Sequence, residues 1–162
     1  DDIDKLSPLV YESIAFKQQI VAQDRDEQNI RKQLNLGHTI GHAVESFFLS
    51  SGKAILHGEA VAAGLIMELY LASKVCSFTI DKRDEIVNLI VKHYAVIEID
   101  ESNLDEIISY MSYDKKNADG KIQFVLLENI GQVLYNQELS YDLILEAFSY
   151  YKNLIKNILK TK

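Results

Sequence analysis

Three of the four histidines in this 162-residue chain lie close together in the sequence, at His38, His42 and His57. A helix would bring His38 and His42 onto one face, because they are four positions apart. Imidazole nitrogens bind zinc and similar metals, and they carry protons near neutral pH. A pair of helix-surface histidines that bind nothing is the ordinary alternative. The spacing therefore indicates a candidate metal or proton-transfer site.

A polar stripe includes these histidines if residues 31–45 form one helix. Spacings of 4, 3, 4 and 3 positions would place five polar side chains within about 80° of one another around the helix axis. The stripe consists of Arg31, Asn35, His38, His42 and Glu45. The opposite face is apolar and carries Leu36, Ile40, Val44 and Phe47. We expect a continuous helix, ending near residues 50–52, that packs one face on the core and turns the other toward a ligand.

A zinc centre with an open position for water or substrate would be matched by His38, His57 and one carboxylate. Gly37 and Gly41 would lie inside the same helix, where each glycine costs about 1 kcal/mol relative to alanine. Such a cost is tolerated where a ligand or another backbone comes close. Tight helix packing explains the two glycines equally well.

Four cations stand out in a chain whose formal net charge is −7, and they are Lys17, Arg31, Lys115 and Lys116. Arg31 shares the polar stripe, and its planar guanidinium suits a carboxylate or a phosphate. These residues favour a small anionic substrate, although a solvated surface charge is the ordinary interpretation of any single lysine. Glu27 lies one turn before Arg31 and could simply form an i, i+4 ion pair with it.

Composition narrows the class of protein. The hydrophobic content of 48% suits one compact domain, and the acidic balance, with a pI near 5.1, argues against nucleic acid as a partner. A single cysteine, Cys76, and the lack of a signal or membrane-spanning pattern indicate a cytoplasmic protein. The sequence has no G-x-G-x-x-G turn, so any nucleotide cofactor would have to be held mostly by something else.

We expect a mainly α, multi-helical domain over residues 1–162, with one small β-hairpin. Ser7 and Pro8 would open the first helix, and the helix that begins near His57 is apolar on nearly every side, as a central buried helix would be. Ser102 and Asp105 would form a capping box. The expected helices cover residues 8–22, 31–50, 57–71, 79–94, 102–113 and 140–158, and the expected strands cover residues 122–127 and 132–135.

The chemistry-bearing motifs match one family in order along the chain. They are Lys17, the charged residues 24–27, Arg31-x-x-x-Asn35-Leu-Gly-His38-Thr-Ile-Gly-His42-Ala-Val-Glu45, His57-Gly-Glu-Ala-Val-Ala-Ala-Gly64 and Asp114-Lys115-Lys116. The chain resembles the C-terminal helical domain of 3-dehydroquinate synthases over essentially its whole length. The resemblance implies the C-terminal half of a two-domain enzyme, whose N-terminal NAD-binding α/β domain is absent from this chain.

The resemblance also implies an activity. Enzymes of this family are carbon–oxygen lyases that convert 3-deoxy-D-arabino-heptulosonate 7-phosphate to 3-dehydroquinate and phosphate, in the shikimate pathway of aromatic amino-acid biosynthesis. They use catalytic NAD and a divalent metal, Zn²⁺ or Co²⁺, and the full-length proteins are commonly homodimers. This chain alone would bind zinc weakly and be inactive, because one metal ligand and the NAD site would lie in the other domain.

Roles follow from the resemblance position by position. His38 and His57 would be metal ligands, and a glutamate of the absent domain would be the third. His42 would move the proton of a substrate hydroxyl, and it would form the catalytic group with Lys17 and Glu27. Glu27 would also orient the substrate-binding shell. The residues that would bind the sugar phosphate are Lys17, Arg31, Asn35 and one of Lys115 and Lys116, with Lys115 favoured.

Three alternatives remain open at the level of sequence. Other sugar phosphate cyclases share the metal histidines but differ among the substrate-binding positions. A metal-dependent alcohol or glycerol dehydrogenase would also contribute histidines, but it has no use for the anion-binding set of Arg31, Asn35 and Lys115. A non-catalytic helical module would use the polar stripe to dock a partner protein.

Overall fold

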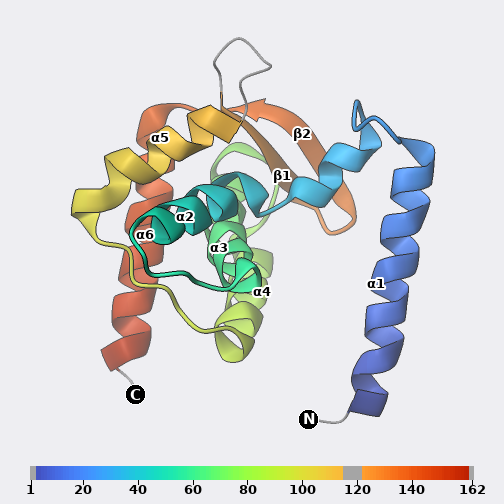
Figure 1. Cartoon of the computed structure of the whole chain (residues 1–162), viewed down its shortest axis with the longest axis horizontal. Coiled ribbons are helices and arrows are strands. Elements are labelled where there is room, and N and C mark those ends of the chain that lie inside the picture. The colour runs from blue at the N-terminus through green and yellow to red at the C-terminus, as the bar shows by residue number, and fades with distance from the viewer. Residues whose placement is uncertain (1–2, 115–121, 161–162) are drawn as a thin grey trace. The chain divides into compact units, whose positions relative to one another are not determined.

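The computed structural model describes residues 3–114 and 122–160 (Figure 1). These residues form two compact units that divide between Asn35 and Leu36. Among them helices predominate, and the strands form one two-stranded antiparallel sheet. The mainly α architecture with one small hairpin, expected from the sequence, is therefore confirmed.

The first unit contains helix α1 (Ile3–Gln23) and the short 3₁₀-helix η1 (Ile30–Asn35). Helix α1 ends where it was expected, but it begins before Ser7, so the prediction that Ser7 and Pro8 open it is wrong. Pro8 is tolerated inside the helix because it lies near the N-terminal end, where it removes one hydrogen bond, to the carbonyl of Asp4. Ile20 is buried, whereas several large apolar side chains of α1 are more than half exposed, namely Leu6, Leu9, Val10, Tyr11, Ile14 and Phe16.

The second unit is built around helix α3 (His57–Val75). This helix contacts α2 (His38–Ser50), α4 (Ile80–His93), α6 (Tyr141–Lys160) and strand β1 (Gln123–Asn129) (Figure 1). Ten of its residues are buried, which confirms its expected place at the centre of the core. Helix α5 (Leu104–Asp114) packs against α2. On the apolar face of α2, Ile40, Val44 and Phe47 are buried, as expected.

Side chains at the helix starts explain several of the observed boundaries. Thr79 accepts a hydrogen bond from the backbone N–H of Lys82 at the start of α4, and Ser140 accepts one from that of Leu143 at the start of α6. The expected capping box at Ser102 is wrong. Asp100 accepts the backbone N–H of Ser102, and the 3₁₀-helix η2 (Glu101–Asn103) precedes α5.

Strands β1 and β2 (Gln132–Glu138) form the expected hairpin. The strands are antiparallel, with Leu126 opposite Leu134 and Asn129 opposite Gln132. Gly131 has φ 77°, a left-handed conformation that suits the tight turn between the strands. The residues of β1 from 124 to 127 are buried, and β1 contacts both α2 and α3, so the hairpin closes one side of the core.

The single helix expected over residues 31–50 is not formed. Helix η1 ends at Asn35, Gly37 has φ 80° and ψ −10°, and α2 begins at His38. A left-handed residue cannot continue a right-handed helix, and glycine adopts this conformation at no steric cost. The expected five-residue stripe is therefore divided: Arg31 and Asn35 lie in the first unit, and His38, His42 and Glu45 lie in the second.

Gly41 does lie inside a helix, and the structure explains why it and Gly64 are small. A Cβ atom on Gly41 would lie 3.0 Å from the Cα of Val61, and one on Gly64 would collide with the carbonyl oxygen of Gly37. The backbones of α2 and α3 thus approach too closely for a side chain at these positions. Of the two explanations for the glycines, close helix packing is the one that the structure supports.

Candidate functional site

The histidines singled out in the sequence come together in the second unit. His38 is the first residue of α2, His42 lies one turn later, and His57 is the first residue of α3. The ring centroid of His38 lies 5.1 Å from that of His42 and 5.6 Å from that of His57, and the His42 and His57 centroids are 5.6 Å apart. One ligand atom from each ring lies within 4.8 Å of the other two. His57 is exposed and the other two rings are half-buried.

Hydrogen bonds at Nδ1 determine which nitrogen carries the proton in two of these rings. Nδ1 of His38 lies 3.0 Å from the carbonyl oxygen of Leu36, and Nδ1 of His57 lies 3.0 Å from Oε2 of Glu45. Both partners can only accept a hydrogen bond, so Nδ1 carries the proton in each ring. In the neutral imidazole this makes Nε2 the unprotonated nitrogen that a metal requires. The three imidazoles therefore suit a divalent metal ion such as zinc.

Glu68 explains why α2 begins at His38. Its side chain is fully buried in the middle of α3, where its carboxylate accepts the backbone N–H of Gly37 at 2.5 Å and that of Ile40 at 3.3 Å. These N–H groups lie at the start of α2, where no partner is available within the helix. Gly37, at the N-cap position, has no side chain that could accept these N–H groups. Glu68 was not among the predicted site residues, although a lone acid in the apolar run of α3 was a visible signal.

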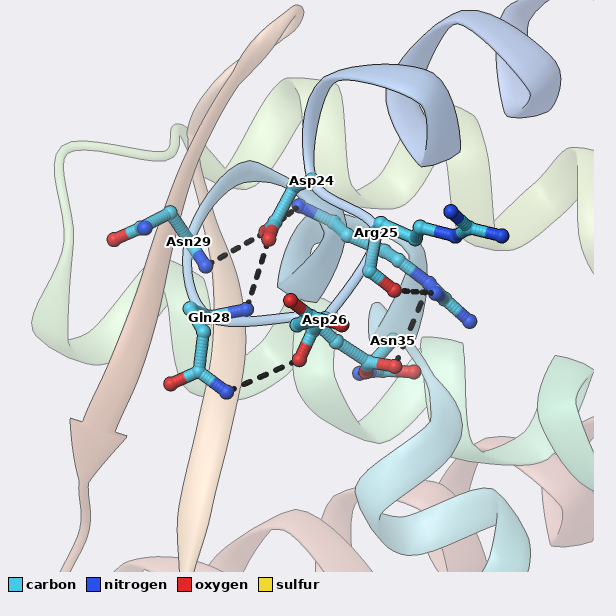
Figure 2. Close-up of polar contacts among 8 residues, drawn as sticks. Asp24, Arg25, Asp26, Gln28, Asn29 and Asn35 are labelled. Atoms are coloured by element: carbon cyan, nitrogen blue, oxygen red, sulfur yellow. Dashed lines mark hydrogen bonds and ion pairs between the residues drawn. The ribbon is translucent and has the colours of Figure 1, made fainter.

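In the first unit, Glu27 lies on the loop between α1 and η1, and Arg31 and Asn35 lie in η1 itself (Figure 2). Asp24, which is 8% exposed, accepts the backbone N–H groups of Gln28 at 3.0 Å, Asn29 at 2.7 Å and Arg31 at 3.0 Å. Burial acts to raise the pKa of Asp24, but these three donors and the nearby Arg31 charge outweigh it and hold the pKa below its ordinary value. One carboxylate thus fixes the path of the loop.

Glu27 joins two of the predicted substrate-binding residues in this unit. Its Oε1 accepts a hydrogen bond from Nδ2 of Asn35 at 2.6 Å, and its Oε2 lies 3.5 Å from Nε of Arg31. Nη1 of Arg31 also donates to the carbonyl oxygen of Arg25 at 2.7 Å. The backbone of Glu27 is left-handed, with φ 56°. The i, i+4 pairing of Glu27 with Arg31 is therefore present, and the same carboxylate orients Asn35.

Comparison with known proteins decides the family. The family model described as 3-dehydroquinate synthase C-terminal matches residues 1–117. The chain belongs to the 3-dehydroquinate synthase family.

Three relatives, each named 3-dehydroquinate synthase, illustrate this membership. The protein from Parabacteroides distasonis is 45% identical over 147 residues, which are 91% of this chain and 42% of the relative. The protein from Acinetobacter baumannii strain AYE is 38% identical over 90% of this chain and 40% of the relative, and that from Dictyoglomus thermophilum is 37% identical over 82% and 36%. The chain thus spans about two fifths of the length of such relatives.

The other residues predicted for a 3-dehydroquinate synthase site are placed less completely. Lys17 is an exposed residue of α1. Lys115 and Lys116 lie outside the described residues. The structure thus groups His38, His42, His57 and Glu45 in one unit, and Glu27, Arg31 and Asn35 in the other.

No described helix is both long and apolar enough to cross a membrane.

Proposed function

We propose that this chain is the metal- and substrate-binding part of a 3-dehydroquinate synthase. The reaction would be the conversion of 3-deoxy-D-arabino-heptulosonate 7-phosphate to 3-dehydroquinate and phosphate. The observation that carries the proposal is the cluster of three imidazoles in a chain that belongs to this family. The anion-binding residues of the first unit support a substrate that carries a carboxylate and a phosphate.

His38 and His57 are the proposed metal ligands, with a third ligand from outside this chain. Each presents Nε2 because its Nδ1 is engaged, as described above. Zn²⁺ or Co²⁺ suits imidazole ligands. A metal ion held there would polarise a hydroxyl of the substrate and fix its orientation.

His42 is the proposed carrier of a substrate proton. It lies one turn from His38, and its ring is nearly perpendicular to that of His38, at an interplanar angle of 88°. This position beside both proposed ligands suits a group that accepts a proton from a hydroxyl and returns it later.

The residues of the first unit are proposed to bind the anionic groups of the substrate. Arg31 and Asn35 would do so directly, and Glu27 would hold both side chains in place through the contacts given above. Lys17 and one of Lys115 and Lys116, with Lys115 favoured, would add positive charge. An arginine guanidinium held by a carboxylate retains N–H donors for a phosphate or carboxylate oxygen.

The sequence has no glycine-rich phosphate-binding turn for NAD, so this chain is expected to supply few of the NAD contacts. We therefore propose that NAD is held by a part of the enzyme other than this chain. The complete reaction would then need that part, so the chain alone is expected to be inactive.

A chimera tests the proposed function. The chain would replace the matching segment of the Parabacteroides distasonis 3-dehydroquinate synthase, and phosphate release from 3-deoxy-D-arabino-heptulosonate 7-phosphate would be measured with NAD and Zn²⁺. We expect turnover within about tenfold of the parent enzyme, and His42→Ala is expected to lower kcat by about 10²- to 10⁴-fold. His93→Ala, at an exposed position outside the cluster, is the matched control and should leave kcat unchanged.

Two results would contradict the proposal. One is a folded, metal-loaded chimera that releases no phosphate. The other is net accumulation of NADH with a phosphate-free polyol, which would indicate a dehydrogenase instead.

A further inference from the structure

Glu45 is the residue of the predicted polar stripe to which the proposed function gives no role. It lies on α2, three positions after His42, and it is half-buried. Its Oε2 lies 3.0 Å from Nδ1 of His57, the first residue of α3. The contact thus reaches from one helix of the cluster to the other.

The protonation of His57 follows from this contact. An ionised carboxylate has no hydrogen to donate, so the proton between the two groups belongs to Nδ1 of His57. The same bond restricts rotation of the imidazole about its bond to Cβ. His38 is held in the same way, but its partner is the main-chain carbonyl of Leu36 rather than a side chain.

We propose that Glu45 is a positioning residue, which keeps His57 in its Nδ1-protonated form and so makes Nε2 the metal-binding atom. The proposal rests on the metal site proposed above. Carboxylates that accept a hydrogen bond from a metal-bound histidine fix its tautomer and make it a stronger ligand, and their loss typically costs about 10- to 100-fold in metal affinity. If Glu45 instead formed an exposed ion pair with a protonated imidazole, that pair would contribute little to the stability of the fold.

The first measurement uses the metal-free chain at about pH 8, where an imidazole of ordinary pKa is neutral. The ¹⁵N chemical shifts of the ring nitrogens report which nitrogen carries the proton. In the wild-type chain we expect His57 to be protonated at Nδ1, and in Glu45→Ala we expect a shift toward the Nε2-protonated form. His38 is an internal control, because its partner is untouched by the substitution. An unchanged His57 spectrum in Glu45→Ala would overturn the proposal.

The second measurement is zinc binding to the same chains by calorimetry. We expect Glu45→Ala to bind zinc about 10- to 100-fold more weakly than the wild type, and Glu45→Gln to lose less, because its amide oxygen can still accept the Nδ1 proton. Glu85→Ala is the matched control, since it removes one exposed negative charge from α4 and should leave the affinity unchanged. Equal zinc affinity in Glu45→Ala and the wild type would also overturn the proposal.

His38→Ala separates this proposal from the proposed function. If Glu45→Ala binds zinc as well as the wild type while His38→Ala does not, the metal site stands and the role of Glu45 is wrong. If the wild-type chain binds no zinc, the proposed metal site fails in this chain, and the tautomer of His57 alone decides whether Glu45 positions its ring.

Discussion

At the scale of single residues, two carboxylates determine the local structure on which the candidate residues depend. Asp24 binds three backbone N–H groups of its loop, and Glu68 binds two at the start of α2. Each fixes a backbone segment, and Arg31 or His38 lies on that segment. Their effect is therefore one of orientation.

The charge of Asp24 should make the loop of the first unit sensitive to acid. Because the folded pKa of Asp24 is lowered from 3.8, its contribution is fully present above pH 3.8 and is lost as the pH falls through the folded pKa. We expect the amide proton shifts of Gln28, Asn29 and Arg31, followed by NMR, to change with a midpoint below pH 3.8. Asp24→Asn should abolish this transition, whereas Asp26→Asn should preserve it. A midpoint at or above 3.8 would contradict the expectation.

At the scale of elements, the crossing of α2 and α3 places His38, His42 and His57 within reach of one another. The two backbones meet at Gly41 and Gly64, and a Cβ atom on Gly64 would collide with the backbone at Gly37 and Gly41. Thr39 also ties α2 to the hairpin, since its hydroxyl donates to the carbonyl oxygen of Gln123 at 3.1 Å. The spacing between the imidazoles is therefore set by helix packing.

Two glycines of the same helix should respond in opposite ways to alanine. Gly64→Ala is expected to destabilise the second unit by about 1–3 kcal/mol or more, because the new methyl group would collide with the backbone of α2. Gly58→Ala should stabilise it by about 0.5–1 kcal/mol, since the nearest atom to its Cβ would be 3.9 Å away and glycine weakens a helix. Urea denaturation measures both changes. Equal effects would show that the close approach of α2 and α3 is not retained in solution.

Much of this element structure was predictable, and the exception is informative. Helices α3, α4 and α6 begin where expected because local signals, such as Thr79 and Ser140, lie next to the helices they start. The break at Gly37 was not predicted, because a glycine can lie inside a helix or end one, and Glu68, which accepts its N–H, lies 31 positions away. The histidine cluster was predicted from residue types and spacing. The bond between Glu45 and His57 was not, because it requires the packing of two helices.

At the scale of the whole molecule, the chain consists of two units, and the second contains the hydrophobic core. Residues 36–162 contain the core, the hairpin and three partners, Leu36, Glu45 and Glu68, which hold His38, His57 and the start of α2 respectively. Residues 1–35 contain one long helix with many exposed apolar side chains and the Asp24 loop. The histidine cluster should therefore not depend on the first unit for its geometry.

A shortened chain tests this independence. We expect residues 36–162 alone to fold, with the same circular dichroism per helical residue and the same ¹⁵N pattern for His38 and His57 as in the complete chain. The matched control is Glu68→Gln in the shortened chain, which should be less stable by about 1–3 kcal/mol because a buried backbone N–H then faces an amide N–H. Loss of the His57 signal pattern in the shortened chain would mean that the first unit supports the cluster.

The two imidazoles proposed to hold a metal are hydrogen-bonded to different kinds of group, one to the main chain and one to a side chain. This difference has an evolutionary consequence. The carbonyl oxygen of Leu36 survives any exchange of the residue at that position, because every amino acid supplies one. The carboxylate of Glu45 disappears with a single codon change. Lineages that drift toward another metal, or toward none, should therefore diverge first at position 45, while the orientation of His38 is inherited unchanged.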